Sequence, residues 1–492
     1  MRPCAVLHIT SLLGGGVDRH VRDIVRRTSG THLVWHVGAS AEALEIPSER
    51  RTTTLDPRRI DEDQAAMARW FRSRSVGIVH AHTLEAKARS RVELVRETLG
   101  ARVMTTLHDV LFLHPDGFED GATLEPQAGW LEENARFLRR ADAVIAPSPF
   151  IARLAGRHIE GLEVNVVPNG SDPPPAIPVV ARPRKEFQEH RPTHVVAVVG
   201  AIGPHKGSDM LEALALELRE SGIAIVVIGY LDRQVMPGWR VPGTYFIHGA
   251  YADDELPALL SAYGARLALF PNRAPESFSY TLSDIWACRL PVLVPRSGAL
   301  GERVAAQCGG WLLDEGFDAK AIAFRLRQLL SPDGSAEFAQ VESQLSQPDP
   351  ARTPALAAMA RSLDALYDRF GLDAAHPAES DPAAIEKLVA TNLDGSLFRE
   401  ELARLADEYA QLARAHANTV EEARRFETES REWIAKLERD VASLKADLER
   451  EVAERRTLGQ ENVQLAIHKA AFDRLPEPLR KWLLKKVIDA RS

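Results

Sequence analysis

Short apolar runs, each followed by a segment with helical periodicity, recur along the first three quarters of the chain. In the N-terminal part these runs lie at 5–10, 33–37, 76–80, 103–107, 143–146 and 164–167. The alternation then restarts, with runs at 195–199, 224–228, 245–248, 267–270 and 291–294. Buried strands that alternate with helices build a doubly wound parallel sheet. The pattern therefore predicts an α/β protein with two Rossmann-like domains.

Segments rich in proline set the expected boundaries. We expect one Rossmann-like domain over 1–172, a proline-rich linker over 173–192 and a second domain over 193–350. A helix is predicted over 351–372, followed by a connector over 373–396. Two such domains that face each other leave a cleft at the carboxyl ends of their strands, where folds of this class bind ligands.

Residues 397–468 have the pattern of a long α-helical coiled coil. No glycine occurs between Ser396 and Leu458, and apolar side chains recur at three- and four-residue spacing. Asn462 occupies an a-type position, whereas Glu451 and Arg455 interrupt the apolar seam, which comprises Ile434, Leu437, Val441, Leu444, Leu448, Leu458 and Leu465. We expect a homodimer or a partner helix along 397–468, with a single solvated helix as the alternative.

Residues 476–490 form a basic, moderately amphipathic tail in which Lys and Arg lie beside Trp and Leu. Such a tail suits either the surface of an anionic membrane or a docking site on a protein. Both interpretations stay open on the sequence alone.

The amino-acid composition argues against several classes of function. Hydrophobic residues make up 45% and charged residues 26% of the 492 positions, as in ordinary globular proteins. The net charge of −8 argues against a nucleic-acid binder, and three scattered cysteines form neither a disulfide framework nor a zinc motif. The start has no signal-peptide pattern, and no apolar run is long enough to span a membrane. We expect a cytoplasmic protein, peripheral at most on the inner face of the cell membrane.

Two motifs in the second domain carry candidate chemistry. Glu276 and Asp284 lie at the ends of a loop and the first turns of a helix, so they can hold two hydroxyl-bearing parts of one ligand. The N–H groups at such a helix start face a phosphate. Lys206 follows the turn at Gly203, where its ammonium can meet a diphosphate. In the first domain, a glycine-rich loop at 14–16 precedes a helix.

These motifs resemble the donor site of the nucleotide-sugar glycosyltransferases of the GT-B fold, family 4 type. The resemblance covers about residues 1–372 and is strongest over 195–304. It implies that the helix at 351–372 returns to the first domain. The chain departs from the family at three positions, where Ala201 replaces an Arg, Ser279 a common Gly and Asp284 the usual Glu. Arg273 is either a substitute for the missing Arg or a surface residue.

The resemblance assigns roles to individual residues. The implied catalytic residues are His108, Lys206 and Glu276. The implied donor-binding residues are Gly15, Gly16, Gly203, Phe278, Ser279, Tyr280, Thr281 and Asp284. Asp18, His82 and Asp109 are candidate acceptor or pocket residues.

No metal is expected in this reading. His80 and His82 have no third ligand at suitable spacing in the sequence. The acidic run at 61–63 follows Pro57 at a predicted helix start and is interpreted as a solvated turn. The co-substrate is a nucleotide-diphosphate sugar, and no cofactor is expected.

The implied function is a retaining transfer of a sugar from a nucleotide-diphosphate donor to a saccharide or lipid-linked glycan, as in bacterial surface-polysaccharide assembly. The alternative is a catalytically degenerate GT-B scaffold in such an assembly. A dinucleotide-dependent dehydrogenase is disfavoured, because no Gly-x-Gly-x-x-Gly follows the first strand.

Overall fold

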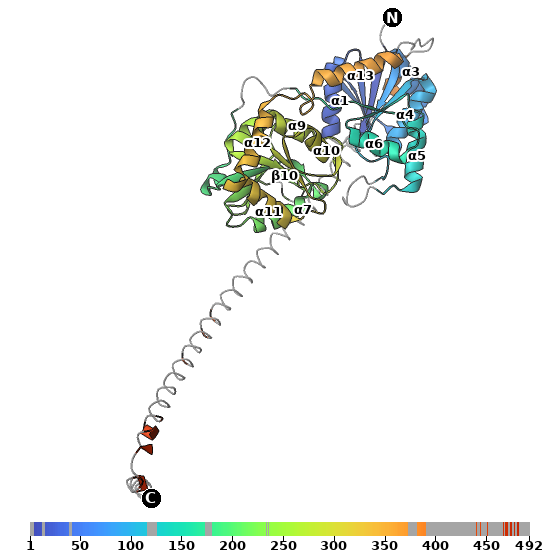
Figure 1. Cartoon of the computed structure of the whole chain (residues 1–492). Coiled ribbons are helices and arrows are strands. Elements are labelled where there is room, and N and C mark those ends of the chain that lie inside the picture. The colour runs from blue at the N-terminus through green and yellow to red at the C-terminus, as the bar shows by residue number, and fades with distance from the viewer. Residues whose placement is uncertain are drawn as a thin grey trace. The chain divides into compact units, whose positions relative to one another are not determined.

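The computed structural model describes residues 4–11, 15–38, 42–115, 125–172, 180–232, 234, 236–371 and 381–389, together with a few residues between 439 and 481. The chain divides into two units, 1–401 and 402–492 (Figure 1). The predicted coiled coil and tail fall almost entirely outside the described residues, and none of the apolar seam residues is among them. No helix in the described part of the chain is both long and apolar enough to cross a membrane.

The N-terminal domain contains an eight-stranded sheet in the order β4-β3-β2-β1-β5-β6-β7-β8. Its strands are β1 (Ala5–Ser11), β2 (His32–Val37), β3 (Glu42–Ile46), β4 (Arg51–Leu55), β5 (Val76–Ala81), β6 (Arg102–Thr106), β7 (Ala143–Ala146) and β8 (Val164–Val166). The five strand pairs β2–β1, β1–β5, β5–β6, β6–β7 and β7–β8 are parallel. The sequence analysis missed the antiparallel edge strands β3 and β4, in which buried residues are interrupted by half-buried or exposed ones, so that neither forms a continuous apolar run.

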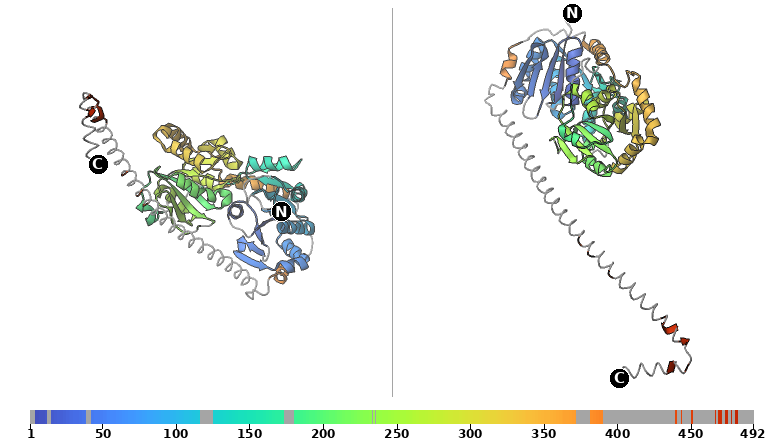
Figure 2. Two further views of the ribbon diagram at one scale, coloured as in Figure 1. Left: turned by 90° about the horizontal axis from the view of Figure 1, so that it is seen from below. Right: turned by 90° about the vertical axis from the view of Figure 1, so that its left-hand side faces the viewer.

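Helices cover both faces of this sheet (Figures 1 and 2). On one face, Ile24 of α1 (Gly16–Arg27) and four residues of α13 (Leu356–Gly371) pack against Val6 and Ile78 of the sheet. On the other face lie α3 (Gln64–Ser73), α4 (Ala86–Leu99), α5 (Ala128–Arg139) and α6 (Pro149–His158). The short helix α2 (Pro57–Glu62) precedes α3. Helix α13 follows the second domain in sequence but packs on the first.

The second domain repeats this plan with a seven-stranded sheet in the order β11-β12-β10-β9-β13-β14-β15. Its strands are β9 (His194–Ile202), β10 (Ile223–Leu231), β11 (Gly238–Val241), β12 (Tyr245–Gly249), β13 (Ala265–Leu269), β14 (Val292–Pro295) and β15 (Gly310–Leu313). Its helices are α7 (Ser208–Glu217), α8 (Leu256–Ala262), α9 (Tyr280–Ala287), α10 (Gly298–Gln307), α11 (Ala319–Leu330) and α12 (Ser335–Ser346). Only β11 pairs antiparallel among these described strands. The two parallel-rich α/β sheets confirm the predicted fold class.

Two segments expected to connect domains are packed against them instead. In the linker, Phe187 of the short helix η2 (Lys185–Glu189) is buried and stacks on Trp239 of the second domain at 5.4 Å. In the connector, the short helix η6 (Ala384–Lys387) places Ala384, Ile385 and Leu388 in the core of the first domain. Residues 381–389 are therefore part of the N-terminal domain.

Candidate active site

The turn between β9 and α7 brings Lys206 to the domain cleft. The carbonyl of Gly203 accepts hydrogen bonds from the backbone N–H groups of Lys206 (2.9 Å) and Ser208 (3.2 Å). Gly207 has φ +79°, and a Cβ there would lie 2.2 Å from the carbonyl oxygen of Pro271. Only glycine allows this close approach, which places Lys206 beside the loop after β13.

Glu276 is held in that loop by its neighbours. Its Oε1 accepts a hydrogen bond from Nδ2 of Asn272 at 2.9 Å and lies 3.7 Å from Nζ of Lys206. Its backbone carbonyl accepts from the N–H of Ala299 at 2.9 Å. Oε1 is thus engaged, which leaves Oε2 of Glu276 as the carboxylate oxygen for a ligand hydroxyl.

A buried arginine, which the sequence analysis missed, supports the loop before α9. The guanidinium of Arg303 donates hydrogen bonds to the carbonyls of Phe278 and Ser279, both at 3.0 Å, and lies over the Phe278 ring at 4.2 Å. Burial lowers its pKa to about 9. Ser279 has φ +71°, and its hydroxyl accepts from the backbone N–H of Leu282 as the N-cap of α9. This conformation explains why glycine is common at that position in the family.

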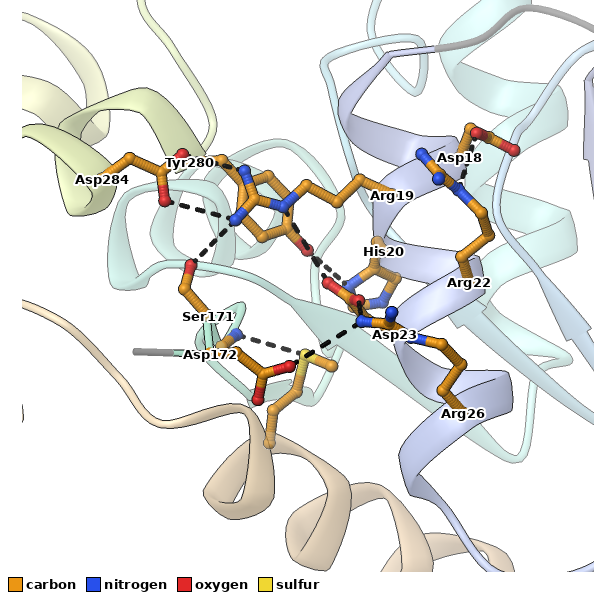
Figure 3. Close-up of polar contacts among 12 residues, drawn as sticks. Asp18, Arg19, His20, Arg22, Asp23, Arg26, Ser171, Asp172, Tyr280 and Asp284 are labelled. Carbon is orange, nitrogen blue, oxygen red and sulfur yellow. Dashed lines mark hydrogen bonds and ion pairs between the residues drawn. The ribbon is translucent and has the colours of Figure 1, made fainter. Parts of the chain in front are cut away.

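Helix α1 carries an arginine across to the second domain (Figure 3). Nη1 of Arg19 lies 2.8 Å from Oδ2 of Asp284, and Nη2 lies 3.2 Å from Oδ1. Nη2 also donates to the Ser171 hydroxyl at 3.3 Å, and the guanidinium lies 4.4 Å from the centroid of the Tyr280 ring. Two-point contacts of this kind fix the relative position of the groups they join. Arg19 therefore joins α1 to α9.

A cavity of about 590 Å³ lies between the two domains. The predicted site residues that line it are Gly15, Gly16, His108, Asp109, Lys206, Glu276, Phe278, Ser279, Tyr280 and Thr281. Asp18 and Asp284 instead line an adjoining cavity of about 570 Å³, and Arg19 lines both. Gly203 lies in the turn before Lys206, and His82 is buried behind His108. Most of the predicted residues thus converge on one cleft.

The histidine side of the cleft is buried and electrically neutral. Nε2 of His108 lies 3.1 Å from Nδ1 of His82. Burial lowers the pKa of both histidines well below the usual value, so both rings are uncharged near pH 7. The adjacent Asp109 accepts a hydrogen bond from the N–H of Leu111 at 2.8 Å, and burial raises its pKa to about 6. The two histidine rings therefore offer neutral donors and acceptors to a ligand, beside the Asp109 carboxylate, which is mostly ionised near pH 7.

The positive charge of the cleft comes from both domains. Lys206, Arg19 and Arg22 line it, and the exposed Ala201 lies among them where the family has an Arg. Arg273 is not a lining residue, because its guanidinium pairs with Asp209 at 2.6 Å. Of the two interpretations left open for Arg273, the structure supports the surface one.

The acidic run at 61–63 has structural partners. Asp61 lies 2.5 Å from the guanidinium of Arg91, and Asp63 is the N-cap of α3, accepting from the N–H of Ala66.

The sequence analysis did not identify Arg19 as a functional residue. Its position one residue after Asp18, on the helix that follows the glycine-rich loop, was an available signal.

Both domains match families of known glycosyltransferases. Residues 14–173 match the family described as Glycosyltransferase Family 4, and residues 181–340 match the family described as Glycosyl transferases group 1. A D-inositol 3-phosphate glycosyltransferase of Segniliparus rotundus is 26% identical over 234 residues. That match covers 45% of this chain and spans only about half (51%) of the relative.

Solved structures share the fold. HepE of Anabaena, solved in complex with UDP and glucose, has a TM-score of 0.53 at 16% identity, covering 74% of this chain and 100% of that one. Sucrose-phosphate synthase of Thermosynechococcus elongatus has a TM-score of 0.54 at 15% identity, covering 74% and 98% of the two chains. At these identities the likeness concerns the fold of the paired domains.

Proposed function

We propose that this chain, which carries the paired family 4 and group 1 domains of a GT-B glycosyltransferase, transfers a sugar from a nucleoside-diphosphate donor with retention of configuration. The observation that carries the proposal is the cleft, where Lys206 and the carboxylate of Glu276 lie opposite His108 and the start of α9. The HepE structure, with UDP and glucose bound to a similar fold, supports a donor of this class.

In the proposed complex the diphosphate lies at the N-terminus of α9, beside Lys206. Free N–H groups and the helix dipole favour a phosphate there. A lysine about 4 Å from a phosphate contributes roughly 4 kcal/mol at an effective dielectric near 20. Because negative charge develops on the leaving phosphate, this contribution stabilises the transition state. The reaction as proposed requires no metal ion.

The sugar is proposed to lie between Glu276 and His108. Oε2 of Glu276 accepts a hydrogen bond from a sugar hydroxyl, while Asn272 holds the other oxygen at 2.9 Å. His108 contacts the sugar near the reacting carbon from the opposite wall. In a retaining reaction of this family the leaving phosphate assists deprotonation of the acceptor hydroxyl on the same face, so the paired carboxylates of glycosidases are not needed.

Arg19 is proposed to supply the phosphate charge that Ala201 lacks. In the structure both oxygens of Asp284 are bonded to Arg19. For Asp284 to bind the donor ribose, as the family motif implies, Arg19 must release it. Arg19 already lines the donor cleft, so a rotation of its side chain brings the guanidinium toward the diphosphate. Donor binding thereby exchanges an ion pair between domains for a phosphate contact.

The acceptor is proposed to be a saccharide or lipid-linked glycan in bacterial surface-polysaccharide assembly. The enzyme is proposed to be cytoplasmic and at most peripherally bound to the inner face of the membrane. Because the relative from Segniliparus rotundus is named a D-inositol 3-phosphate glycosyltransferase, a phosphorylated polyol is a further acceptor to test. The competing proposal, a scaffold without activity, rests on the departures at Ala201 and Asp284.

The decisive experiment is a screen of UDP-, GDP-, ADP- and dTDP-sugars for a thermal shift, followed by donor hydrolysis and transfer. We expect one nucleotide class to raise the unfolding temperature and to turn over. Activity should persist in EDTA. A complete absence of turnover with a bound donor would favour the scaffold, and activity lost in EDTA and restored by Mg²⁺ or Mn²⁺ would contradict the metal-free reaction.

The role of Arg19 is tested with the nucleoside diphosphate selected by that screen. Arg19→Met should weaken its binding at least 10-fold, and the double change Arg19→Met with Ala201→Arg should restore most of the loss. Arg27→Met is the matched control, because Arg27 lies at the end of the same helix, pairs with Asp172 and lines neither cavity. Equal affinities for the parent and Arg19→Met would exclude Arg19 as a phosphate ligand.

A further inference from the structure

Behind the cleft, the N-terminal domain buries a group of histidines that the proposed transfer does not use. His8 lies on β1, His20 on α1, His32 on β2, and His80 and His82 at the end of β5. All five are at most 5% exposed. Buried polar rings need partners, and the hydrogen bonds around these rings show which ring nitrogens carry the protons.

One backbone carbonyl sets the tautomers of three rings. Nε2 of His32 lies 3.2 Å from the carbonyl oxygen of Ser29 and therefore carries the proton. Nδ1 of His32 then accepts from Nε2 of His8, and Nδ1 of His8 accepts from Nε2 of His82, both at 3.0 Å. The chain of bonds ends on Nδ1 of His82, which is left with a lone pair that points to His108.

His20 provides a second lone pair at the same place. Its ring lies 4.6 Å from that of His108 and 5.6 Å from that of His82. Its Nδ1 lies 3.4 Å from the hydroxyl of Tyr280 (Figure 3), but Nε2 is buried without a hydrogen-bond partner. An unpaired buried nitrogen costs free energy unless something binds it.

One ligand nitrogen from each of His20, His82 and His108 can be chosen so that all three lie within 4.8 Å of one another. Zinc–nitrogen bonds of about 2.0–2.1 Å in a tetrahedron place the ligand atoms roughly 3.4 Å apart, a distance that small ring movements reach from here. His8, His80 and His82 meet the same distance criterion. In that second group, however, both ring nitrogens of His80 are already bonded, to Tyr367 at 2.8 Å and Thr106 at 2.7 Å.

We propose that His20, His82 and His108 bind a divalent transition-metal ion of the zinc class, with the fourth position open toward the cleft. Neutral imidazole suits Zn²⁺, Ni²⁺ and Cu²⁺, whereas Mg²⁺ and Ca²⁺ prefer oxygen ligands. The ligands are Nε2 of His20, Nδ1 of His82 and Nε2 of His108. The proton on Nε2 of His108 moves to Nδ1, so binding releases no net proton.

The surrounding hydrogen bonds match those of protein metal sites. Nε2 of His82 donates to His8, which continues to His32 and the Ser29 carbonyl. Nδ1 of His20 faces the Tyr280 hydroxyl. Partners of this kind orient the rings and raise their basicity, and their loss weakens metal binding 10–100-fold in known sites.

Metal binding has a consequence that rests on the proposed function. His108 would contact the donor sugar, so an ion that binds its ring competes with the donor for the cleft. We therefore expect Zn²⁺ to inhibit transfer, in agreement with a reaction that needs no metal.

The test uses untagged full-length protein, stripped with EDTA and titrated with ZnCl₂ by calorimetry. We expect one tight Zn²⁺ per chain, no binding of Mg²⁺ in the same range, and a Zn²⁺ affinity at least 10-fold weaker in His20→Gln. His36→Gln is the matched control, since His36 lies at the end of β2, near Glu45, and outside the cluster. Circular dichroism of each variant shows whether it is folded.

Because His20 is buried, His108→Gln serves as a second variant, at the edge of the cluster, and should lose Zn²⁺ in the same way. No Zn²⁺ binding by the parent, or equal binding by the parent and both folded cluster variants, would overturn the site. Inhibition by Zn²⁺ is compared with the zinc-free rate of each variant. Calorimetry needs no activity, so a failure of the transfer reaction leaves the metal result readable.

Discussion

At the scale of single residues, the cleft holds its charges in pairs that a substrate must rearrange. Lys206 lies 3.7 Å from Glu276, and Arg19 is bonded to Asp284. All four side chains are partly exposed, so these pairs are screened by water and are weak in the free protein. A diphosphate and a sugar can therefore replace them at little cost.

Lys206→Ala should lower kcat on the order of 100-fold or more, as expected for the loss of a donor that stabilises developing charge. The fold should persist, because the side chain is partly exposed and its close contact is with Glu276. Lys185→Ala, an exposed lysine of the same domain, is the control. Turnover within about threefold of the parent would remove Lys206 from the mechanism.

Asp284→Ala should raise the donor KM more than it lowers kcat, because ribose contacts are equal in the ground and transition states. Asp284→Glu restores the family residue and should be tolerated. Steady-state kinetics with the selected donor separates the two parameters. A collapse of kcat at unchanged KM would mean that Asp284 acts in the chemical step or in the structure.

Two substitutions of Ser279 distinguish the cost of its positive φ from the stabilisation by its N-cap hydrogen bond. Ser279→Gly should leave the urea midpoint nearly unchanged, since relief of a positive φ, worth about 1 kcal/mol, offsets the lost cap and the higher entropy of the unfolded chain. Ser279→Ala keeps the strain and should lose about 1 kcal/mol with the cap. Ser297→Gly is the control at φ −76°, where glycine gains nothing. A Gly variant less stable than the Ala variant would refute this explanation.

The sequence identified the residues that stand in motifs but not those that complete the site from elsewhere in the chain. Lys206 and Glu276 could be found because each lies at a turn with a distinctive pattern. Arg303 and the partners of His82 could not be found in this way, and Arg19 was recognisable only by its place on the helix after the glycine-rich loop. Their roles depend on which side chains approach across the two domains or between neighbouring strands, and no local spacing encodes that.

At the scale of elements, helix α1 joins three parts of the molecule. It begins at Gly16 beside the donor cleft, carries Arg19 to α9, and places His20 over the buried histidines. Residues three and four apart share a helix face, so one short amphipathic segment can serve several sites. Its amphipathic pattern was readable from the sequence, but the partner of each face was not.

The helix η6 indicates where the first domain ends. Ile385 and Leu388 are at most 4% exposed, and Arg59 donates to the carbonyls of Lys387 and Val389. Truncation after residue 375 should therefore destabilise the domain by roughly 3–6 kcal/mol, an upper estimate for two buried apolar side chains. Truncation after residue 390 should not.

Thermal unfolding of the two truncated proteins tests this boundary. Leu388→Ala in the full chain should cost about 2–5 kcal/mol, and Glu386→Ala, which is exposed, should cost little. Equal stability of the two truncations would place the domain end before η6.

At the scale of the whole molecule, the two Rossmann-like domains could be predicted because alternation of strands and helices is a repeated, local signal. Helix α13 and η6 then return the chain to the first domain, so the cleft is completed before residue 390. Nothing after that point is needed to build the site. We therefore expect the residues after 390 to serve association and not catalysis.

The last prediction is that residues 397–468 associate with another helix, whereas the two Rossmann-like domains need no partner for the proposed transfer. This segment has about 72 residues, or about 108 Å as a helix at 1.5 Å per residue. Its apolar seam from Ile434 to Leu465 requires a second helix to cover it, and a buried Asn462 would help to set the register. Full-length protein should be a homodimer or bind a partner helix, whereas protein truncated after residue 390 should be a monomer.

Light scattering gives the number of chains per particle for both proteins. The truncated protein should still transfer sugar to a short, freely diffusing acceptor, and only the full chain should sediment with anionic vesicles if 476–490 binds membranes. Leu437→Lys with Leu444→Lys disrupts the seam without shortening the chain, and Ala435→Lys with Ala442→Lys adds the same two positive charges outside it. Monomers in every case would reject self-association. Dimers that survive the seam changes would place the contact elsewhere, because lysines at two core positions leave charges that such an interface cannot solvate.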